Sequence, residues 1–340
     1  MITMKRIAEI AHVSPSTVSN VLHGRVEKMT TGTLERVQRA IKDNNYVANM
    51  SGRTLGQYGS KIIGVVMIYD RRDKLNAMQA PFFAEIIGSL EHEIRTRGYF
   101  MMLYISADVE EILRMAMSWN IEGMVVLGGG SDDCRTIMQR TSIPVVFIDQ
   151  YVQHKGIQYN NIGLQDWQGA YMMTEYLIAQ GHERIAFVAD EKPPVGLDHE
   201  RLQGCKTAMA EHGLSFLPED FIYASYLSEE RHRDLTRFAA RRLHNYTALF
   251  FASDYLAADS VNLFQDKGIR IPRDISVAGF DDNIFATQVR PQLTTVKQDV
   301  SQKAFYAINQ VLTLIRKEKP EQNQIRLPVS LSIRDSVAKI

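Results

Sequence analysis

Hydrophobic residues in positions 1–60 recur every three or four residues, which is the spacing of an amphipathic helix. They form three groups, namely Ile7, Ile10 and Ala11; Val18, Val21 and Leu22; and Leu34, Val37, Ala40 and Ile41. This pattern predicts three short helices. Ser14 can cap the second helix, and Pro15 suits its first position because proline has no N–H to lose. Three helices with a tight turn between the first two are typical of a helix-turn-helix DNA-binding domain.

From residue 61 onward, apolar runs alternate with amphipathic stretches. The runs typical of strands include 61–68, 100–105, 123–128, 144–149, 184–189, 220–224, 248–253, 275–280, 293–298 and 329–334. Helical patterns lie between them, for example at 82–97, 165–180, 201–213 and 254–267. Strands that alternate with helices form parallel sheets covered on both faces. With about eleven strands, we expect an α/β fold with two doubly wound parallel-sheet lobes.

The charges balance over the whole chain but not along it. The 340 residues contain 39 Lys and Arg against 39 Asp and Glu. Residues 1–60 hold eight cations and four acids, a net charge of +4, and the remainder therefore carries −4. A small basic segment on a slightly acidic body is the arrangement of a protein that contacts a polyanion at one end. The alternative is a basic face that is merely solvated.

Composition and hydropathy limit the class of protein. Hydrophobic residues make up 45% of the chain and charged residues 23%, as in soluble domains, and the length predicts two or three domains. The apolar run at 62–68 is too short to cross a bilayer, and the N-terminal segment lacks the apolar region of a secretory signal. We therefore expect a cytoplasmic protein. Cys134 and Cys205 lack CxxC spacing, which favours buried thiols over a disulfide or a zinc site.

The sequence contains no catalytic or cofactor-binding pattern that we recognise. The glycines at 128–130 follow a strand, but neither the GxGxxG nor the GxxxxGK[ST] spacing is present, so a loop is the better interpretation. His92, His182 and His199 neighbour glutamates without forming HExxH, and no serine lies in a GxSxG turn. We therefore predict that the protein is not an enzyme and needs no cofactor or metal ion.

Small and apolar residues follow one another in a specific order over more than forty positions of the N-terminal segment. The order consists of KRIAEIAHVS at 5–14, TVSNVL at 17–22, Thr33, ERV at 35–37, Tyr46 and Asn49. It resembles the DNA-binding domain of the lactose-repressor (LacI/GalR) family of bacterial transcription regulators. His12 stands where that family usually has glycine.

In that family the second helix lies in the major groove, and the resemblance gives its base-reading positions to Pro15, Ser16 and Asn20. An asparagine can bond an adenine edge through two hydrogen bonds, a serine hydroxyl suits several bases, and a proline offers only apolar contact. The remaining polar positions fit phosphate contacts or helix caps better. They are Ser14, Thr17 and Ser19. The alternative for Asn20 is an exposed polar residue without a partner.

The segment SGRTLG at 51–56 resembles the family's hinge helix, whose leucine wedges into the minor groove and kinks the operator. The resemblance gives that role to Leu55, and a structural or phosphate-binding role to Arg53. Glycines at 52, 56 and 59 disfavour a helix in the free protein. We therefore expect the hinge to become ordered on DNA.

Four further strings extend the resemblance over the whole chain. They are APFFAEII from Ala80, GHERIAFV from Gly181, DKGIRIPRDISVAGFD from Asp266 and LTTV from Leu293. The resemblance implies a periplasmic-binding-protein-like body, with a ligand cleft between its lobes. Helix 83–97 and strand 61–68 have more apolar surface than one sheet face needs. The family dimerises through that lobe, so we expect a homodimer that associates there.

The resemblance divides the chain into a DNA-binding domain at 1–48, a hinge at 49–60 and an effector-binding domain at 61–340. The first lobe would comprise about 61–160 and 291–327, and the second about 161–290 and 328–340. The chain would then cross between the lobes near Asn160, Arg290 and Leu327.

Ligands of open parallel sheets bind beyond the carboxyl ends of the strands. We expect Arg201, at the start of a helix, and Asp281 to hold adjacent hydroxyls of a polyol, and Phe82 or Phe83 to cover the apolar side of a sugar ring. The alternatives are a structural salt bridge for Arg201, a helix cap for Asp281 and core packing for one phenylalanine.

Two other residues at strand ends are expected to assist in the same cleft. They are Asp70, after the first strand of the body, and Ser253, after the strand at 248–253. Asp254 fits better as a cap for the helix that begins there.

Taken together, the sequence predicts a sequence-specific DNA-binding transcription regulator, a repressor that binds a pseudo-palindromic operator as a homodimer and responds to a small effector. A sugar or a sugar phosphate is the expected effector, because most relatives bind one, and a nucleobase stacked on Phe82 and Phe83 is the alternative. A solute-binding protein would share the two lobes, and an oxidoreductase or a sugar-converting enzyme would share the α/β layers.

Overall fold

The computed structural model describes residues 2–22, 25–27, 29–44, 46, 59–69, 77–151 and 158–340. The chain divides into two compact units, residues 1–60 and residues 61–340, which we call the head and the body. Most of the expected hinge, including Arg53 and Leu55, lies outside the described residues, and so does Asp70. Among the described residues, no helix combines the length and the apolar character that crossing a membrane requires.

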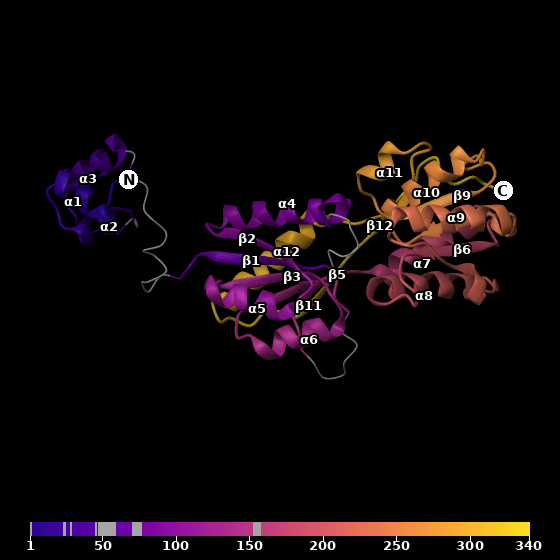
Figure 1. Ribbon diagram of the computed structural model, residues 1–340, viewed down its shortest axis with the longest axis horizontal. Coiled ribbons are helices and arrows are strands. Elements are labelled where there is room, and N and C mark those ends of the chain that lie inside the picture. Colours follow the sequence, from indigo (N-terminus) through magenta and orange to yellow (C-terminus); the bar gives the residue numbers. More distant parts are fainter. Residues whose placement is uncertain are drawn as a thin grey trace. The chain divides into compact units, whose positions relative to one another are not determined.

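The described part of the head contains three helices, as the hydrophobic spacing predicts (Figure 1, indigo). They are α1 (Met4–Ile10), α2 (Pro15–Leu22) and α3 (Thr31–Asp43). Their buried apolar faces form one small core, which consists of Ile7, Ala8, Ala11, Val18, Val37, Ala40 and Tyr46. Ile10 departs from the prediction, because its side chain is exposed.

The turn between α1 and α2 fixes where α2 begins. His12 has a φ of 51°, a left-handed conformation that glycine adopts without strain, which explains why glycine suits this position. The hydroxyl of Ser14 accepts a hydrogen bond from the Thr17 amide at 3.1 Å, and Pro15 is the first helical residue. The predicted cap of α2 is therefore confirmed.

The first lobe of the body contains a six-stranded parallel sheet in the order β11-β5-β4-β3-β1-β2. Its strands are β1 (Ile62–Ile68), β2 (Phe100–Ser106), β3 (Gly123–Gly128), β4 (Val145–Ile148), β5 (Asn161–Leu164) and β11 (Gln324–Leu327). Helices α4 (Pro81–Thr96) and α12 (Val300–Ile315) cover one face, and α5 (Val109–Ser118) and α6 (Ser131–Arg140) cover the other (Figure 1).

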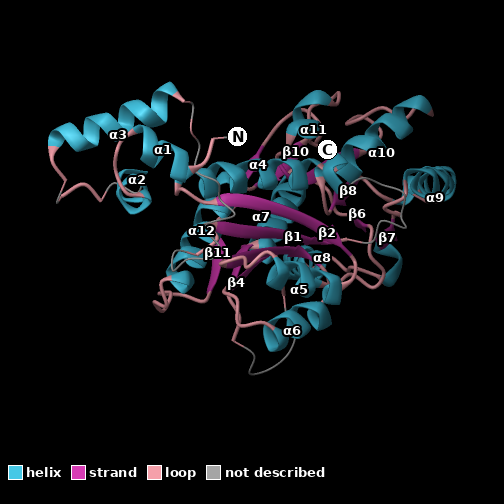
Figure 2. Cartoon of the chain, turned by 60° about the vertical axis from the view of Figure 1, so that its left-hand side comes forward, coloured by secondary structure: helices cyan, strands magenta, loops and turns pink. Residues whose placement is uncertain are grey.

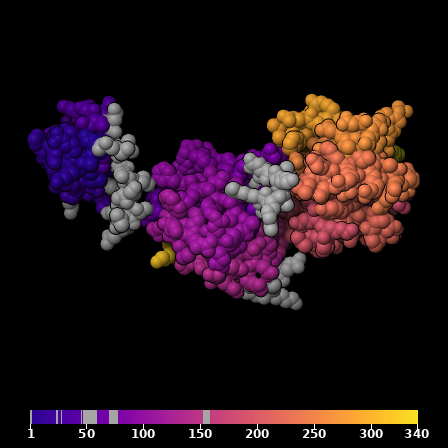
Figure 3. All heavy atoms as spheres, viewed as in Figure 1, coloured from indigo at the N-terminus to yellow at the C-terminus, as the bar shows by residue number. Residues whose placement is uncertain are grey.

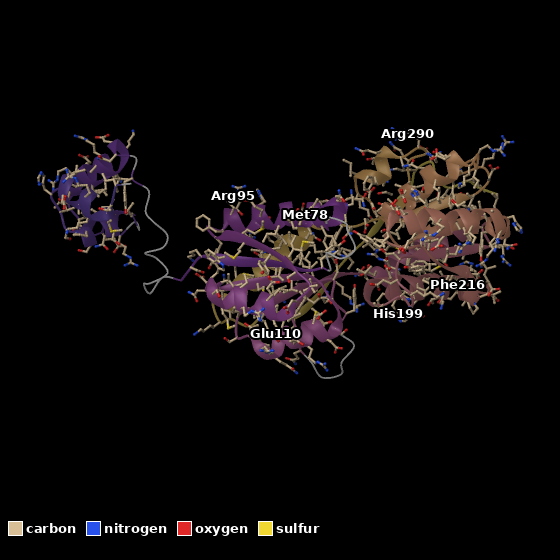
Figure 4. The ribbon with its side chains drawn as sticks, viewed as in Figure 1. Met78, Arg95, Glu110, His199, Phe216 and Arg290 are labelled. Carbon is tan, nitrogen blue, oxygen red and sulfur yellow. The ribbon has the colours of Figure 1, made fainter. Side chains whose placement is uncertain are left out.

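The two faces of this sheet have separate cores because successive side chains point to opposite sides of a strand. Val65 and Val125 pack toward α4 and α12, and Val66 and Val126 pack toward α5 and α6. In Figure 4, Arg95 on α4 and Glu110 on α5 mark the two opposite outer sides of the lobe.

The second lobe contains another six-stranded sheet, in the order β12-β10-β9-β8-β6-β7. Its strands are β6 (Ile185–Ala189), β7 (Phe221–Tyr223), β8 (Ala248–Phe251), β9 (Ser276–Asp281), β10 (Thr294–Lys297) and β12 (Ser330–Ser332). Its helices are α7 (Asp166–Ala179), α8 (Gly196–Glu211), α9 (Ser228–Arg241), α10 (Asp254–Asp266) and α11 (Ile284–Gln288). The short β12 runs antiparallel to β10, so the sheet is parallel except at that edge.

Both sheets therefore lie between layers of helices (Figure 2), and the α/β fold with two doubly wound lobes is confirmed. Short 3₁₀ turns occur at Ala77–Gln79, Pro218–Asp220 and Leu243–Asn245. Cys134 and Cys205 are buried free thiols, as predicted.

The chain crosses between the lobes later than the sequence suggested. Strand β5 belongs to the first sheet, so the first crossing follows Leu164 rather than Asn160. Strand β10 belongs to the second sheet, so the second crossing follows Lys297 rather than Arg290. The third crossing lies between β11 and β12, next to Leu327 as expected.

Helix α8 packs closely on α7 because Gly204 has no side chain. A Cβ atom at Gly204 would lie 2.1 Å from the carbonyl oxygen of Trp167. We predict that Gly204→Ala lowers the free energy of unfolding of the body by about 1–3 kcal/mol, the usual cost of overpacking. Urea denaturation measures this change.

Gly88→Ala is the matched control, because a Cβ at this exposed position of α4 meets nothing within 4 Å and alanine favours a helix. A Gly204→Ala protein as stable as the wild type would contradict the close helix packing.

Candidate DNA-binding surface and effector cavity

The N-terminal part of α2 presents polar side chains to solvent. Ser14, Pro15, Ser16 and Asn20 are exposed, and Val18 on the opposite side is fully buried in the head core. Thr17 and Ser19 are half-buried beside them. Helix α2 contains no acidic residue, so nothing on it repels phosphate. This face has the size of a recognition helix and the hydrogen-bonding groups that base edges require.

A cavity of about 540 Å³ lies between the two lobes of the body. The first lobe contributes the loops after β3 and β4 and the start of α4, and the second lobe contributes the loops after β6 and β8 and the start of α8. These are carboxyl ends of strands and N-terminal ends of helices, where open parallel sheets bind ligands. In the space-filling view the magenta first lobe and the orange second lobe are distinct masses of atoms (Figure 3).

Four of the predicted effector-binding residues line this cavity. They are Phe82, Phe83, Arg201 and Ser253. The two phenylalanine rings are tilted by 57°, with centroids 5.6 Å apart. The role of these residues in binding a ligand stays a prediction.

Arg201 is held by the second lobe itself. It lies in the second turn of α8 rather than at its start, and it is only 4% exposed. Its Nε donates to Oδ1 of Asp166 at 2.8 Å, its Nη2 lies 2.8 Å from the same oxygen, and its Nη1 donates to the carbonyl of Ala252 at 2.6 Å. The guanidinium also lies 3.6 Å from the centroid of the Phe280 ring. The structural salt bridge that we considered as an alternative is therefore present.

This pairing still leaves Arg201 able to bind a ligand. A guanidinium has five N–H donors, and the contacts above use three of them. Burial opposes the positive charge, but Asp166, Asp281 and Asp198 raise the pKa of Arg201 above its ordinary value. Arg201 therefore stays charged, lines the cavity, and has two N–H donors that these contacts do not use.

Asp281 lies beside the cavity instead of lining it. Its Oδ1 accepts a hydrogen bond from Nε2 of Gln298 at 2.8 Å. Burial raises the pKa of Asp281 to about 6, against the opposing effects of Arg201, Gln298 and Lys303. Asp281 does not cap α11, because Asn283 fills that position. Direct contact between Asp281 and a ligand stays a prediction. It would require the Gln298 side chain to move away from Asp281.

A buried lysine connects the two lobes next to the cavity. Lys303, in the first turn of α12, has no exposed surface. Its Nζ donates to Oδ2 of Asp149 at 2.7 Å and to Oε1 of Gln298 at 2.9 Å. Because Gln298 also holds Asp281, one chain of hydrogen bonds runs from the end of β4 in the first lobe to the end of β9 in the second.

Asp254 does not cap α10, which corrects the expectation. The cap is Ser253, whose hydroxyl accepts a hydrogen bond from the Leu256 amide at 3.4 Å. Asp254 is fully buried, and its carboxylate accepts from the Thr295 hydroxyl at 2.6 Å and from the Asn283 amide at 3.2 Å. It therefore ties α10 to the loop after β9.

The sequence patterns did not identify several residues that line the cavity. They are Asp149, Gln150 and Tyr151 after β4, Asp190 and Glu191 after β6, and Asp198 in the first turn of α8. The first five lie at the ends of the predicted strands at 144–149 and 184–189, so the rule about strand ends points to their positions. The Tyr151 hydroxyl donates to Asp166 and so supports the partner of Arg201.

The comparisons with known proteins agree with this organisation. Residues 3–49 match the model of the bacterial regulatory proteins of the lacI family, and residues 174–337 match the periplasmic binding protein-like domain. The HTH-type transcriptional repressor PurR of Pasteurella multocida is 30% identical over 346 residues, which cover 99% of each chain. The chain belongs to the lacI family. The HTH-type transcriptional regulator MalR of Clostridium butyricum is a second relative, 29% identical over 99% of each chain.

Solved structures share the fold of this lacI-family chain. A lac repressor dimer bound to operator and the anti-inducer ONPF superposes with a TM-score of 0.86, at 22% identity and over 99% of each chain. The complex of the transcriptional regulator CelR with cellobiose gives 0.74, at 23% identity and over 99% of this chain and 100% of the other. With its lacI-type head and its periplasmic-binding-type body, this lacI-family member is a DNA-binding transcriptional regulator with an effector-binding domain.

We predict that Lys303→Met lowers the free energy of unfolding by about 3–5 kcal/mol near neutral pH, because it leaves Asp149 buried without its cation. The loss should grow as the pH rises. Burial raises the pKa of Asp149 even with Lys303 present, so without Lys303 the folded state binds a proton there more tightly than the unfolded state does. The free energy of unfolding therefore falls as the pH rises and Asp149 loses its proton.

Gln302→Met, at the neighbouring exposed position, is the control and should change stability little. Urea unfolding of both variants at acidic and at mildly alkaline pH makes the comparison. A loss for Lys303→Met that is small, or that does not depend on pH, would contradict this assignment.

Proposed function

We propose that this chain is a repressor that binds a pseudo-palindromic operator as a homodimer, and that a small polyhydroxylated effector in the interlobe cavity controls its affinity for that operator. The observation that carries this proposal is the pairing of an exposed polar recognition face on α2 with a cavity formed by strand ends of both lobes. A protein of this kind acts where the bacterial chromosome lies, in the cytoplasm.

The head supplies the DNA contacts in this proposal. Ser16 and Asn20 read base edges, Pro15 makes an apolar contact, and Ser14, Thr17 and Ser19 contact phosphates. The net charge of +4 on residues 1–60 attracts the duplex without regard to sequence. Two heads related by a two-fold axis double these contacts and require two half-sites.

A carbohydrate fits the cavity better than a nucleobase does. The rings of Phe82 and Phe83 are tilted by 57° and so cannot both stack on one flat base, whereas one ring can cover a sugar. The remaining N–H groups of Arg201 and the carboxylates around it suit the hydroxyls of a polyol. Among structures of the same fold, one is a complex with cellobiose and another, a LacI family regulator from Enterococcus faecium, holds ribose.

The effector would act by changing how the lobes are held relative to each other. Its contacts would reach both lobes, and the hydrogen-bond chain through Lys303 and Gln298 already connects the two lobes next to the cavity. A ligand shifts such an equilibrium only by its difference in affinity for the two arrangements. A coupling of about 1–3 kcal/mol is typical of allosteric proteins.

The dimer surface that we propose is the β2 edge of the first lobe. Strand β1 cannot serve as we expected, because β2 and β3 pair with both of its edges and its central residues are buried. Strand β2 ends the sheet, and its Phe100 and Leu103 are 56% and 37% exposed. Phe305 on α12, a helix that packs against α4, is also exposed.

We predict that Asn20→Ala weakens binding to the selected operator by about 1–3 kcal/mol per head and changes binding to a scrambled duplex little, because a bidentate base contact is lost and phosphate contacts remain. Gln38→Ala on the exposed side of α3 is the control and should leave both affinities unchanged. Fluorescence anisotropy with a duplex selected from a random pool measures the difference. Equal losses on both duplexes would exclude a base contact by Asn20.

We predict that Phe100→Lys weakens self-association at least about tenfold, because it places a charge in an apolar contact. Sedimentation velocity over a range of concentrations measures this effect. Trp119→Lys, which changes a 57% exposed residue beyond the end of α5, is the control and should stay dimeric. A wild-type chain that sediments as a monomer, or a Phe100→Lys chain that associates normally, would refute this surface.

A further inference from the structure

The described lining of the effector cavity is acidic. Four carboxylates face it, namely those of Asp149, Asp190, Glu191 and Asp198. Arg201 is the one cation among the described lining residues. A site for a phosphorylated sugar needs the opposite balance, because a phosphate carries roughly −1.5 to −2 charges at neutral pH.

Internal ion pairs make this imbalance larger. Asp166 neutralises Arg201, and Lys303 neutralises Asp149. The other three acids, Asp190, Glu191 and Asp198, form no ion pair with a described cation. The described part of the cavity therefore offers a ligand three carboxylates and no uncompensated positive charge.

Asp198 is the carboxylate that most needs a partner. It is 6% exposed, it lines the cavity from the first turn of α8, and no described residue donates a hydrogen bond to it. A buried carboxylate without a donor costs free energy that a bound cation would recover. One oxygen of Asp149, Oδ1, is likewise buried without a hydrogen-bond partner in the described structure.

We infer that the effector carries a protonated amino group and no phosphate, as an amino sugar does, and that Asp198 and Asp190 accept the hydrogen bonds of its ammonium. This inference rests on the proposed function only in taking the interlobe cavity as the effector site. Charge-assisted hydrogen bonds are about twice as strong as neutral ones, so the amine is the main determinant of selectivity. The free N–H groups of Arg201 and the Phe82 and Phe83 rings then bind the ring hydroxyls and the apolar ring face.

Isothermal titration calorimetry of the full chain with matched sugars tests this inference. Each set contains the neutral sugar, its 2-amino derivative, the N-acetyl form, which has no charge, and the 2-amino 6-phosphate, for the gluco, galacto and manno series. We expect the amine of at least one series to bind at least about tenfold more tightly than its three counterparts. The inference is overturned if no amine binds, or if a neutral or phosphorylated member binds more tightly than the amine.

Asp198→Asn separates the charge of this residue from its shape. The variant should lose at least about tenfold in affinity for the amine and keep its affinity for the neutral sugar, because only the charge interaction is removed. Glu200→Gln on the same helix, outside the cavity lining, is the matched control and should bind both sugars as the wild type does. An Asp198→Asn protein with an unchanged preference for the amine would contradict the assignment.

The pH dependence of binding gives a second readout. The pKa of Asp198 is raised to about 7, mainly by burial and also by Asp190, Glu191 and Asp166, against the opposing effect of Arg201. An ammonium ligand favours the deprotonated carboxylate, so its affinity should rise between about pH 5 and pH 7. The affinity for the neutral sugar should not rise in this way.

Operator binding, measured separately, distinguishes the two proposals. If the chain binds its operator but no amine, this inference fails and the proposed DNA-binding function stands. If an amine binds as described but leaves the operator affinity unchanged, the inferred preference of the cavity for an amine stands and the proposed control of DNA binding fails.

Discussion

The arrangement of the body at the junction of its lobes depends on two buried cations, each of which needs a carboxylate partner. Lys303 and Arg201 both lie at the junction of the lobes with almost no exposed surface. A buried charge without a partner is strongly destabilising, so each cation requires a carboxylate at a defined place. Asp149 at the end of β4 serves Lys303, and Asp166 at the start of α7 serves Arg201. These pairs fix the strand ends and helix starts that form the cavity.

The same pairs define what the cavity can recognise. Because Arg201 and Lys303 are already neutralised inside the protein, the remaining acids determine the charge that a ligand meets. The chain of hydrogen bonds through Gln298 also spans the second crossing between the lobes, so a ligand that competes for Asp281 or Asp149 acts on the connection itself. In the proposed mechanism, recognition of the effector and control of lobe geometry therefore share residues.

Local patterns predicted much of the fold. The start of α2 followed from Ser14 and Pro15, whose capping chemistry is local, and most strands followed from long apolar runs. Strands β5 and β11 were missed because each mixes polar residues into a run of only four, whereas β4 and β8 are equally short but wholly apolar. The lobe crossings were misplaced for a related reason, since nothing local says which sheet a short strand joins.

The site was predicted less completely than the fold. Arg201 and Phe82 were found because strand ends and family positions identify them. The pairing of Arg201 with Asp166 joins residues 35 positions apart, and Lys303 meets Asp149 across 154 positions, so the sequence pattern could not reveal either. Asp254 looked like a helix cap because it begins α10, but tertiary contacts with Thr295 and Asn283 take its oxygens instead.

The central claim is that operator DNA and a ligand in the interlobe cavity act on one equilibrium. The most direct test measures the affinity of the tightest-binding sugar of the panel with and without saturating operator, and the affinity of the operator with and without that sugar. Linkage requires both ratios to be the same, and the account predicts a common factor of roughly 5–150. Ratios of one in both experiments, with sugar and operator each bound, would contradict it.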